Sequence, residues 1–181
     1  YESYCGAIIA AIALGASLFN GSTIGIIVPL LLAATGVIAS IIGTFFVRTG
    51  EGANAQKALN LGSGIAMLLA VIAAFFVCQL LPEANYDLTF PVAFKYGAFI
   101  AVASGLIAGF LIGKLTEYYT SFDYKPVKMI AGSCETGTAT NIISGVATGM
   151  LSTALPVIVV AIAILVSYHF AALYGIALAA V

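Results

Sequence analysis

Charged side chains are scarce in this sequence of 181 residues. It holds six Lys and Arg and seven Asp and Glu, so that 7% of the residues are charged and 62% are hydrophobic. About a quarter of the residues of an ordinary globular domain are charged, and so few polar groups cannot cover the surface of a soluble domain of this size. The formal net charge of −1 leaves no basic patch that would indicate nucleic-acid binding. The composition therefore indicates an integral membrane protein with lipid as its surroundings.

The sequence also lacks a metal-ligand cluster and a recognisable catalytic constellation. Cys5, Cys78 and Cys134 are odd in number and have no metal-ligand spacing, so we expect reduced thiols that pack as small hydrophobes. His169, the single histidine, is expected to be an interface residue rather than a proton relay. We expect no catalytic, cofactor-binding or metal-binding residue here. Because the sequence opens without Met or a basic leader, we also expect a piece of a longer protein.

Long uncharged stretches are what the sequence has instead. A helix needs about 20 apolar residues to cross the hydrocarbon core of a bilayer. Six candidate spans result, of which the first and the last are short and are expected to be truncated: 1–19, 25–47, 58–81, 94–113, 138–166 and 171–181. The sequence thus predicts an all-α, polytopic membrane protein with its helices packed in a bundle.

The division between the last two spans follows from length. Residues 136–181 contain no acidic or basic side chain. As one helix they would be about 69 Å long, more than twice the thickness of the hydrocarbon core. The chain must fold back, and residues 167–170, with the sequence SYHF, are the preferred place because polar and aromatic side chains favour the interface. Pro156 predicts a kink inside the fifth span.

The positions of Lys and Arg predict the orientation. Five of these six residues lie in the connections 48–57 and 114–137, and the other connections hold only Lys95. Basic residues are retained on the cytoplasmic side, so we expect these two connections to be cytoplasmic.

Glycines recur within several spans and predict close packing of helices. The residues concerned are Gly62, Gly64, Gly105, Gly109, Gly113, Gly145 and Gly149.

Glu2 is the carboxylate that the sequence places nearest to membrane depth, because an apolar run begins two residues after it. An acid in that position needs a cation, a proton or a partner, unless it lies at the interface. From the residues alone, a channel, a secondary transporter and a pump all remain open.

Several motifs then resemble one family. In chain order they are ESYCGAI from Glu2, GKLTEYYTS from Gly113, YKPV from Tyr124, SCETGTATNIISG from Ser133 and MLSTALPV from Met150. Together they resemble the membrane-bound, ion-translocating inorganic pyrophosphatases over the whole sequence. The resemblance implies a homodimer of subunits with sixteen helices in two rings. This chain would run from the end of helix six to the start of helix eleven, mostly in the outer ring.

What the resemblance implies for function is a pump of the cell membrane or of an acidic organelle. It would hydrolyse pyrophosphate at a cytoplasmic Mg²⁺ site and move Na⁺ or H⁺ outward, in some members with K⁺ dependence. The family's hydrolytic aspartates would lie outside this chain, whose only Asp residues are Asp87 and Asp123. A secondary transporter or a structural membrane module without pyrophosphatase activity is the alternative.

The resemblance gives Glu2 a specific role. It matches the glutamate of the ion gate on helix six, which proton pumps of the plant type carry one helical turn later, at the position of Gly6. This match favours Na⁺ over H⁺ as the pumped ion. Residues 138–166 resemble a helix that contributes to the dimer contact.

Overall fold

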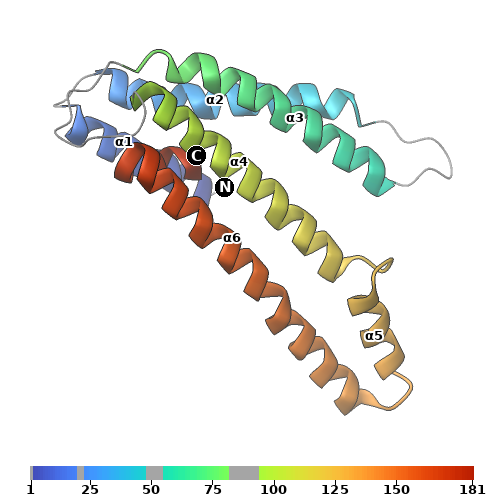
Figure 1. The fold of residues 1–181 in the computed structure, drawn as a ribbon. Coiled ribbons are helices and arrows are strands. Elements are labelled where there is room, and N and C mark those ends of the chain that lie inside the picture. The colour runs from blue at the N-terminus through green and yellow to red at the C-terminus, as the bar shows by residue number, and fades with distance from the viewer. Residues whose placement is uncertain (1, 20–22, 48–54, 82–93) are drawn as a thin grey trace. The chain divides into compact units, whose positions relative to one another are not determined.

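The computed structural model describes residues 2–19, 23–47, 55–81 and 94–181, and every regular element in these ranges is an α-helix (Figure 1). The elements are α1 (Glu2–Leu18), α2 (Thr23–Phe45), α3 (Ala55–Cys78), α4 (Phe94–Thr120), α5 (Lys125–Ser133) and α6 (Thr138–Ala180). Four helical segments in these ranges are long and apolar enough to cross a membrane, and α1 is a shorter apolar helix. The prediction of an all-α, polytopic membrane protein is confirmed.

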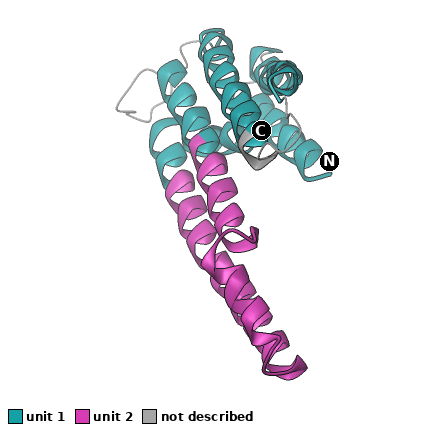
Figure 2. Ribbon diagram, turned by 90° about the vertical axis from the view of Figure 1, so that its right-hand side faces the viewer, with its two compact units in different colours: residues 1–106, 165–181 teal, residues 107–164 magenta. Residues whose placement is uncertain are grey.

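The chain forms two compact units (Figure 2). Unit 1 comprises residues 1–106 and 165–181, and unit 2 comprises residues 107–164. Unit 1 contains a core of buried apolar side chains from α2, α3, α4 and the last residues of α6. Unit 2 contains the second half of α4, α5 and most of α6.

Glycine allows the helices of unit 1 to approach one another closely. A Cβ atom added at Gly25 of α2 would lie 2.7 Å from the carbonyl oxygen of Gly15 in α1. A Cβ atom added at Gly43 of α2 would lie 2.9 Å from the carbonyl oxygen of Gly62 in α3. In lipid, where burying leucine gains little, such backbone contacts are a main source of helix association. These four glycines therefore allow α1 and α2, and α2 and α3, to approach closely at one point each.

The α6 element is interrupted near its end. Its dihedral angles leave the helical region at Ala171 (φ −145°, ψ 23°) and at Ala172 (φ 50°, ψ −146°). Ala172 is the one described non-glycine residue with a positive φ. The break lies directly after the segment 167–170 in which the sequence predicts a turn. By contrast, the backbone around Pro156 keeps helical dihedral angles. The helix is therefore not interrupted at this proline, where the sequence predicts a kink.

Contacts with α4 show that the break reverses the chain. Before it, Ser167 lies opposite Ser104, with their hydroxyl oxygens 3.1 Å apart, and Phe170 lies against Gly97, so the two segments run antiparallel. After it, Gly175 lies against Ala101 and Ala179 lies against Gly105, so the last residues of α6 run parallel to α4. The 43-residue element is thus two helices of opposite direction.

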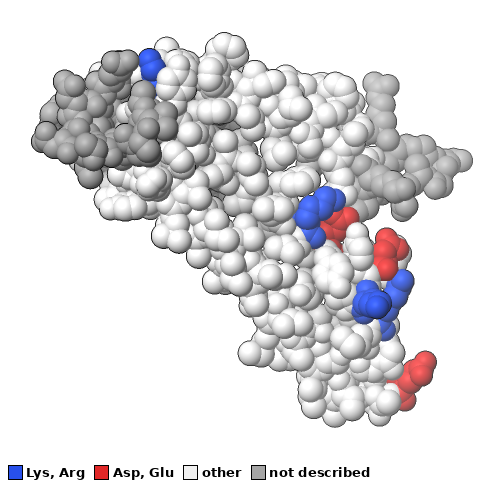
Figure 3. Space-filling model, in the orientation of Figure 1, with Lys and Arg blue, Asp and Glu red and all other residues white. Residues whose placement is uncertain are grey.

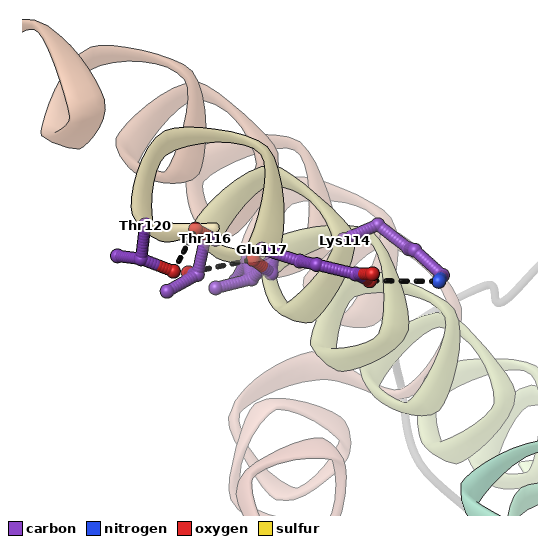
Figure 4. A network of polar contacts seen from close by, with 5 residues as sticks. Lys114, Thr116, Glu117 and Thr120 are labelled. Carbon is purple, nitrogen blue, oxygen red and sulfur yellow. Dashed lines mark hydrogen bonds and ion pairs between the residues drawn. The ribbon is translucent and has the colours of Figure 1, made fainter. Parts of the chain in front are cut away.

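The segment 114–137, predicted as a connection, is largely helical in the structure. α4 continues to Thr120, and α5 follows after a short turn. An ion pair of 2.8 Å joins Lys114 to Glu117, and the hydroxyl groups of Thr116 and Thr120 donate to backbone carbonyls one turn earlier (Figure 4). The hydropathy of this segment therefore indicates where apolar sequence ends and not where the helix ends. Most of the other predicted connection, 48–57, lies outside the described residues.

Among the described residues, the close packing predicted at seven glycines is seen at two of them. Gly62 and Gly105 lie against neighbouring backbone. An added Cβ atom would meet no atom within 4 Å at the other five positions, within the part of the chain described here: Gly64, Gly109, Gly113, Gly145 and Gly149.

Candidate functional site

Glu2 lies in the first turn of α1, on a face of the helix that stays exposed along its length. On this face the exposed residues Glu2, Gly6, Ala10, Ala13 and Ser17 recur every three or four positions, and Ser3, Tyr4 and Ile9 of α1 are exposed as well. The opposite face carries the buried Ala11 and Gly15. Residues at these spacings share one side of a helix, so Glu2 and Gly6 lie on the same open face. A Cβ atom added at Gly6 would meet nothing within 4 Å among the described residues.

The start of α1 is held by α2 on its other side. The hydroxyl group of Tyr4 donates a hydrogen bond of 3.4 Å to the carbonyl oxygen of Ala33. Cys5 is a free thiol and is partly buried. Glu2 itself forms no hydrogen bond or ion pair with another described residue. Its carboxylate oxygens can therefore accept a cation or a proton from the open side of the helix.

His169 forms no hydrogen bond or ion pair with Glu2. It is exposed, it lies just before the chain reversal, and its ring contacts that of Phe170 with centroids 5.2 Å apart.

The described residues do not provide a site that suits Mg²⁺. No group of three or more His, Cys, Asp or Glu side chains gathers within the ranges that the structure describes. Mg²⁺ is bound by carboxylates and phosphate oxygens in near-octahedral geometry. Asp123 is exposed in the turn after α4, and Asp87 lies outside the described residues. The three cysteines are free, with Cys78 buried and Cys134 exposed.

Sequence reasoning missed Tyr174, the largest fully buried side chain among the described residues. Its hydroxyl group donates a buried hydrogen bond of 3.1 Å to the carbonyl oxygen of Gly25. In an α-helix this carbonyl would accept from the N–H of residue 29, but Pro29 has none. Pro29 within an uncharged span was the available signal, since it predicts an unpaired carbonyl in a setting without water. The signal does not reveal which residue supplies the donor.

The sequence of the chain is similar to those of known proteins. A family model described as inorganic H⁺ pyrophosphatase matches residues 1–181. The "Putative K(+)-stimulated pyrophosphate-energized sodium pump" of Clostridium tetani is 41% identical over the whole chain. The "K(+)-insensitive pyrophosphate-energized proton pump 2" of Moorella thermoacetica is 44% identical over 93% of the chain. The "K(+)-insensitive pyrophosphate-energized proton pump" of Caldanaerobacter subterraneus is 39% identical over 99% of the chain.

The alignments cover almost all of this chain but only about a quarter of each relative. The chain covers 26% of the length of the Clostridium tetani relative, 24% of the Moorella thermoacetica relative and 27% of the Caldanaerobacter subterraneus relative. It is an integral, multi-pass membrane segment. Since the family model matches from the first residue to the last, this chain belongs to the inorganic H⁺ pyrophosphatase family.

Proposed function

We propose that the chain is a membrane segment of a pump that hydrolyses pyrophosphate and moves Na⁺ or H⁺ outward. The match of the whole chain to relatives named as pyrophosphate-energized sodium and proton pumps carries this proposal. The same names favour it over a secondary transporter or a structural module, which would not require pyrophosphate as an energy source.

The hydrolytic chemistry is proposed to lie in other parts of the full-length parent. The described residues of this chain lack the set of carboxylates that Mg²⁺ needs, so no hydrolytic step is assigned to them. Any dependence on K⁺, a property in which the named relatives differ, is assigned elsewhere as well. The role of this chain is then ion passage and the packing of the membrane helices, in a sixteen-helix subunit that forms homodimers.

Glu2 is proposed as the ion-binding residue of the gate. A carboxylate in a membrane helix is costly unless it meets a cation, a proton or a partner. Glu2 starts an exposed face of α1 on which Gly6, Ala10 and Ala13 leave room for an ion or for a closely packed helix. Relatives named as sodium pumps and as proton pumps have similar identities to this chain, so overall identity does not select the ion. The position of Glu2 within the ESYCGAI motif favours Na⁺.

The test replaces Glu2 by Gln in the full-length parent, which keeps the size of the side chain and removes its charge. Reconstituted vesicles would report Na⁺ uptake, acidification and pyrophosphate hydrolysis together. We expect transport to be lost, while Glu117→Gln, the same chemical change in an ion-paired acid, leaves transport intact. Unchanged pumping of both ions by the Glu2 variant would refute the gate assignment. A parent without pyrophosphatase activity would refute the pump itself.

The orientation and the dimer contact complete the proposal. The connections 48–57 and 114–137 are placed in the cytoplasm because they hold five of the six basic residues. Residues 138–166 are proposed to contribute to the dimer. Large apolar side chains that are exposed along this stretch, among them Ile143, Met150, Val157 and Leu165, support an apolar neighbour.

A further inference from the structure

Tyr174 brings four helical segments of unit 1 together at one point. Its ring centroid lies 5.5 Å from that of Phe19, directly after α1, and 6.2 Å from that of Phe94, at the start of α4. A Cβ atom added at Gly15 of α1 would lie 3.1 Å from a carbon of the same ring. The hydroxyl group donates to the carbonyl oxygen of Gly25 in α2. Since Tyr174 follows the reversal, these contacts join α1, α2 and α4 to the last residues of α6.

Two groups of helices meet at Tyr174. The α1–α2 group is joined by a hydrogen bond near the start of α1 and by the contact of Gly15 with Gly25 near its end. The α4–α6 group consists of the first half of α4 and the last residues of α6, with Gly105 against Ala179. Among the residues that the structure describes, the bond from Tyr174 to Gly25 is the one side-chain hydrogen bond between these two groups.

No ion pair among the described residues fixes the position of α1. The described part of unit 1 includes three charged residues, Glu2, Lys57 and Lys95, and Glu2 forms no ion pair with a described residue. In Figure 3 the charged side chains gather mainly over the last turns of α4 and over α5, which lie in unit 2. In apolar surroundings, helices are held by close packing and by hydrogen bonds between them. The placement of α1 in unit 1 therefore depends on contacts such as those of Tyr174.

Glu2 lies at the far end of α1 from this junction. The helix runs without interruption from Glu2 to Leu18 and contains no proline, so we treat it as a rigid rod. From Glu2 to Gly15 it is about 20 Å long at 1.5 Å per residue, and a rotation of about 3° about Gly15 would move Glu2 by about 1 Å. A misplacement of about 1 Å can lower the activity of a site by about 100-fold. A small change at Tyr174 is thus large enough at Glu2 to affect ion binding.

We propose that Tyr174 is a positioning residue for the ion site at Glu2. Its ring and its hydroxyl group fix the α1–α2 group against the α4–α6 group, and α1 carries this placement to the carboxylate about 20 Å away. The inference rests on the proposed role of Glu2 in ion binding. It assigns Tyr174 no contact with the ion itself.

The experiment measures how transport by the full-length parent in vesicles depends on ion concentration. Tyr174→Phe keeps the ring and removes the hydrogen bond to α2. Tyr168→Phe is the matched control, because Tyr168 is 55% exposed just before the reversal. A loss of folded protein lowers only the maximal rate, whereas a displaced ion ligand raises the Na⁺ concentration at half-maximal transport, or changes the corresponding pH if H⁺ is moved. Glu2→Gln, measured in parallel, tests the ion site itself.

We expect Tyr174→Phe to raise the Na⁺ concentration at half-maximal transport about threefold or more, and Tyr168→Phe to leave it unchanged. A Pro29→Ala background separates positioning from the pairing of a buried carbonyl. There α2 supplies its own donor to Gly25, but Tyr174→Phe still removes the bond between the two groups of helices. The shift in ion dependence should therefore persist in this background while the thermal stability recovers.

The possible outcomes separate this inference from the proposed function. If Glu2→Gln abolishes transport and Tyr174→Phe leaves the ion dependence unchanged, the positioning role is overturned and the gate assignment stands. A shift that disappears in the Pro29→Ala background would also overturn the positioning role, because only the carbonyl would then matter. An equal shift in Tyr168→Phe would show that the effect is not specific to the junction. Unchanged transport in Glu2→Gln would refute the gate assignment, and this inference with it.

Discussion

The hydrogen bond from Tyr174 to Gly25 offers the sharpest test of how this membrane bundle is held together. Pro29 leaves the carbonyl of Gly25 without its helical donor, and Gly25, Pro29 and Tyr174 are all buried. We predict that Tyr174→Phe destabilises the full-length parent, because the ring still fills its site against Phe19 and Phe94 while the carbonyl loses its donor.

The magnitude follows from the surroundings of the carbonyl. A buried acceptor left without a donor costs about 1–3 kcal/mol in water-soluble proteins. Hydrogen bonds between membrane helices contribute less, on average about 0.6 kcal/mol and at most about 1.7 kcal/mol, because the unfolded chain in the membrane also finds partners. Since Pro29 prevents α2 from supplying a donor of its own, we expect a value in the upper part of that range, about 1–1.5 kcal/mol.

Repeating the Tyr174→Phe substitution in a Pro29→Ala variant tests whether the hydroxyl group compensates for the proline. Pro29→Ala restores an N–H group that can donate to Gly25, so Tyr174→Phe should cost less than about half as much when it is combined with Pro29→Ala. Thermal unfolding in detergent micelles, measured for the parent, both single variants and the double variant, gives the comparison. Equal losses in the two backgrounds would show that the hydroxyl group does not compensate for the proline, and the explanation would then be wrong.

Two further predictions concern packing and orientation. Gly25→Ala should destabilise the full-length parent by about 1–3 kcal/mol, because the added Cβ atom would lie 2.6 Å from the ring of Phe19. Gly36→Ala is the control in the same helix, since its Cβ atom would meet nothing within 4 Å among the described residues, and an equal loss from both variants in thermal unfolding would contradict the close approach. A membrane-impermeant maleimide should label the exposed Cys134 in inside-out vesicles and leave it unlabelled in intact cells, whereas the buried Cys78 should react in neither. Labelling of Cys134 in intact cells would reverse the proposed orientation.

Charge and length alone predicted much of this fold. The absence of charge from residue 136 onward, set against the thickness of a bilayer, required a reversal, and the structure places it at Ala171 and Ala172. The end of α4 was less predictable. The apolar sequence stops at Gly113, but the helix continues to Thr120 because an ion pair and threonine hydroxyls bonded to the backbone are compatible with it in a polar setting.

The candidate site was predictable only where a single residue carries the chemistry. Glu2 was identified as a carboxylate beside an apolar run, and its role on the open face of α1 stays a prediction that transport measurements test. Tyr174 was not identified, because its role depends on a carbonyl 149 residues away in the sequence. A tyrosine in an apolar stretch has many possible partners, and only the reversal at Ala172 brings this one to α2.

The glycines show why small residues do not by themselves identify a helix contact. Gly105 and Gly109 are one turn apart in α4, yet Gly105 lies against the backbone of Ala179, while Gly109 has no neighbour within 4 Å among the described residues. The last residues of α6 reach Gly105 with Ala179, whereas no described residue lies opposite Gly109. A run of glycines makes a surface that a helix can approach, whereas the path of the rest of the chain decides whether a helix does so. In a segment that covers about a quarter of its relatives' length, open glycines such as Gly109 and Gly113 are therefore the positions at which we expect helices of the full-length parent to pack.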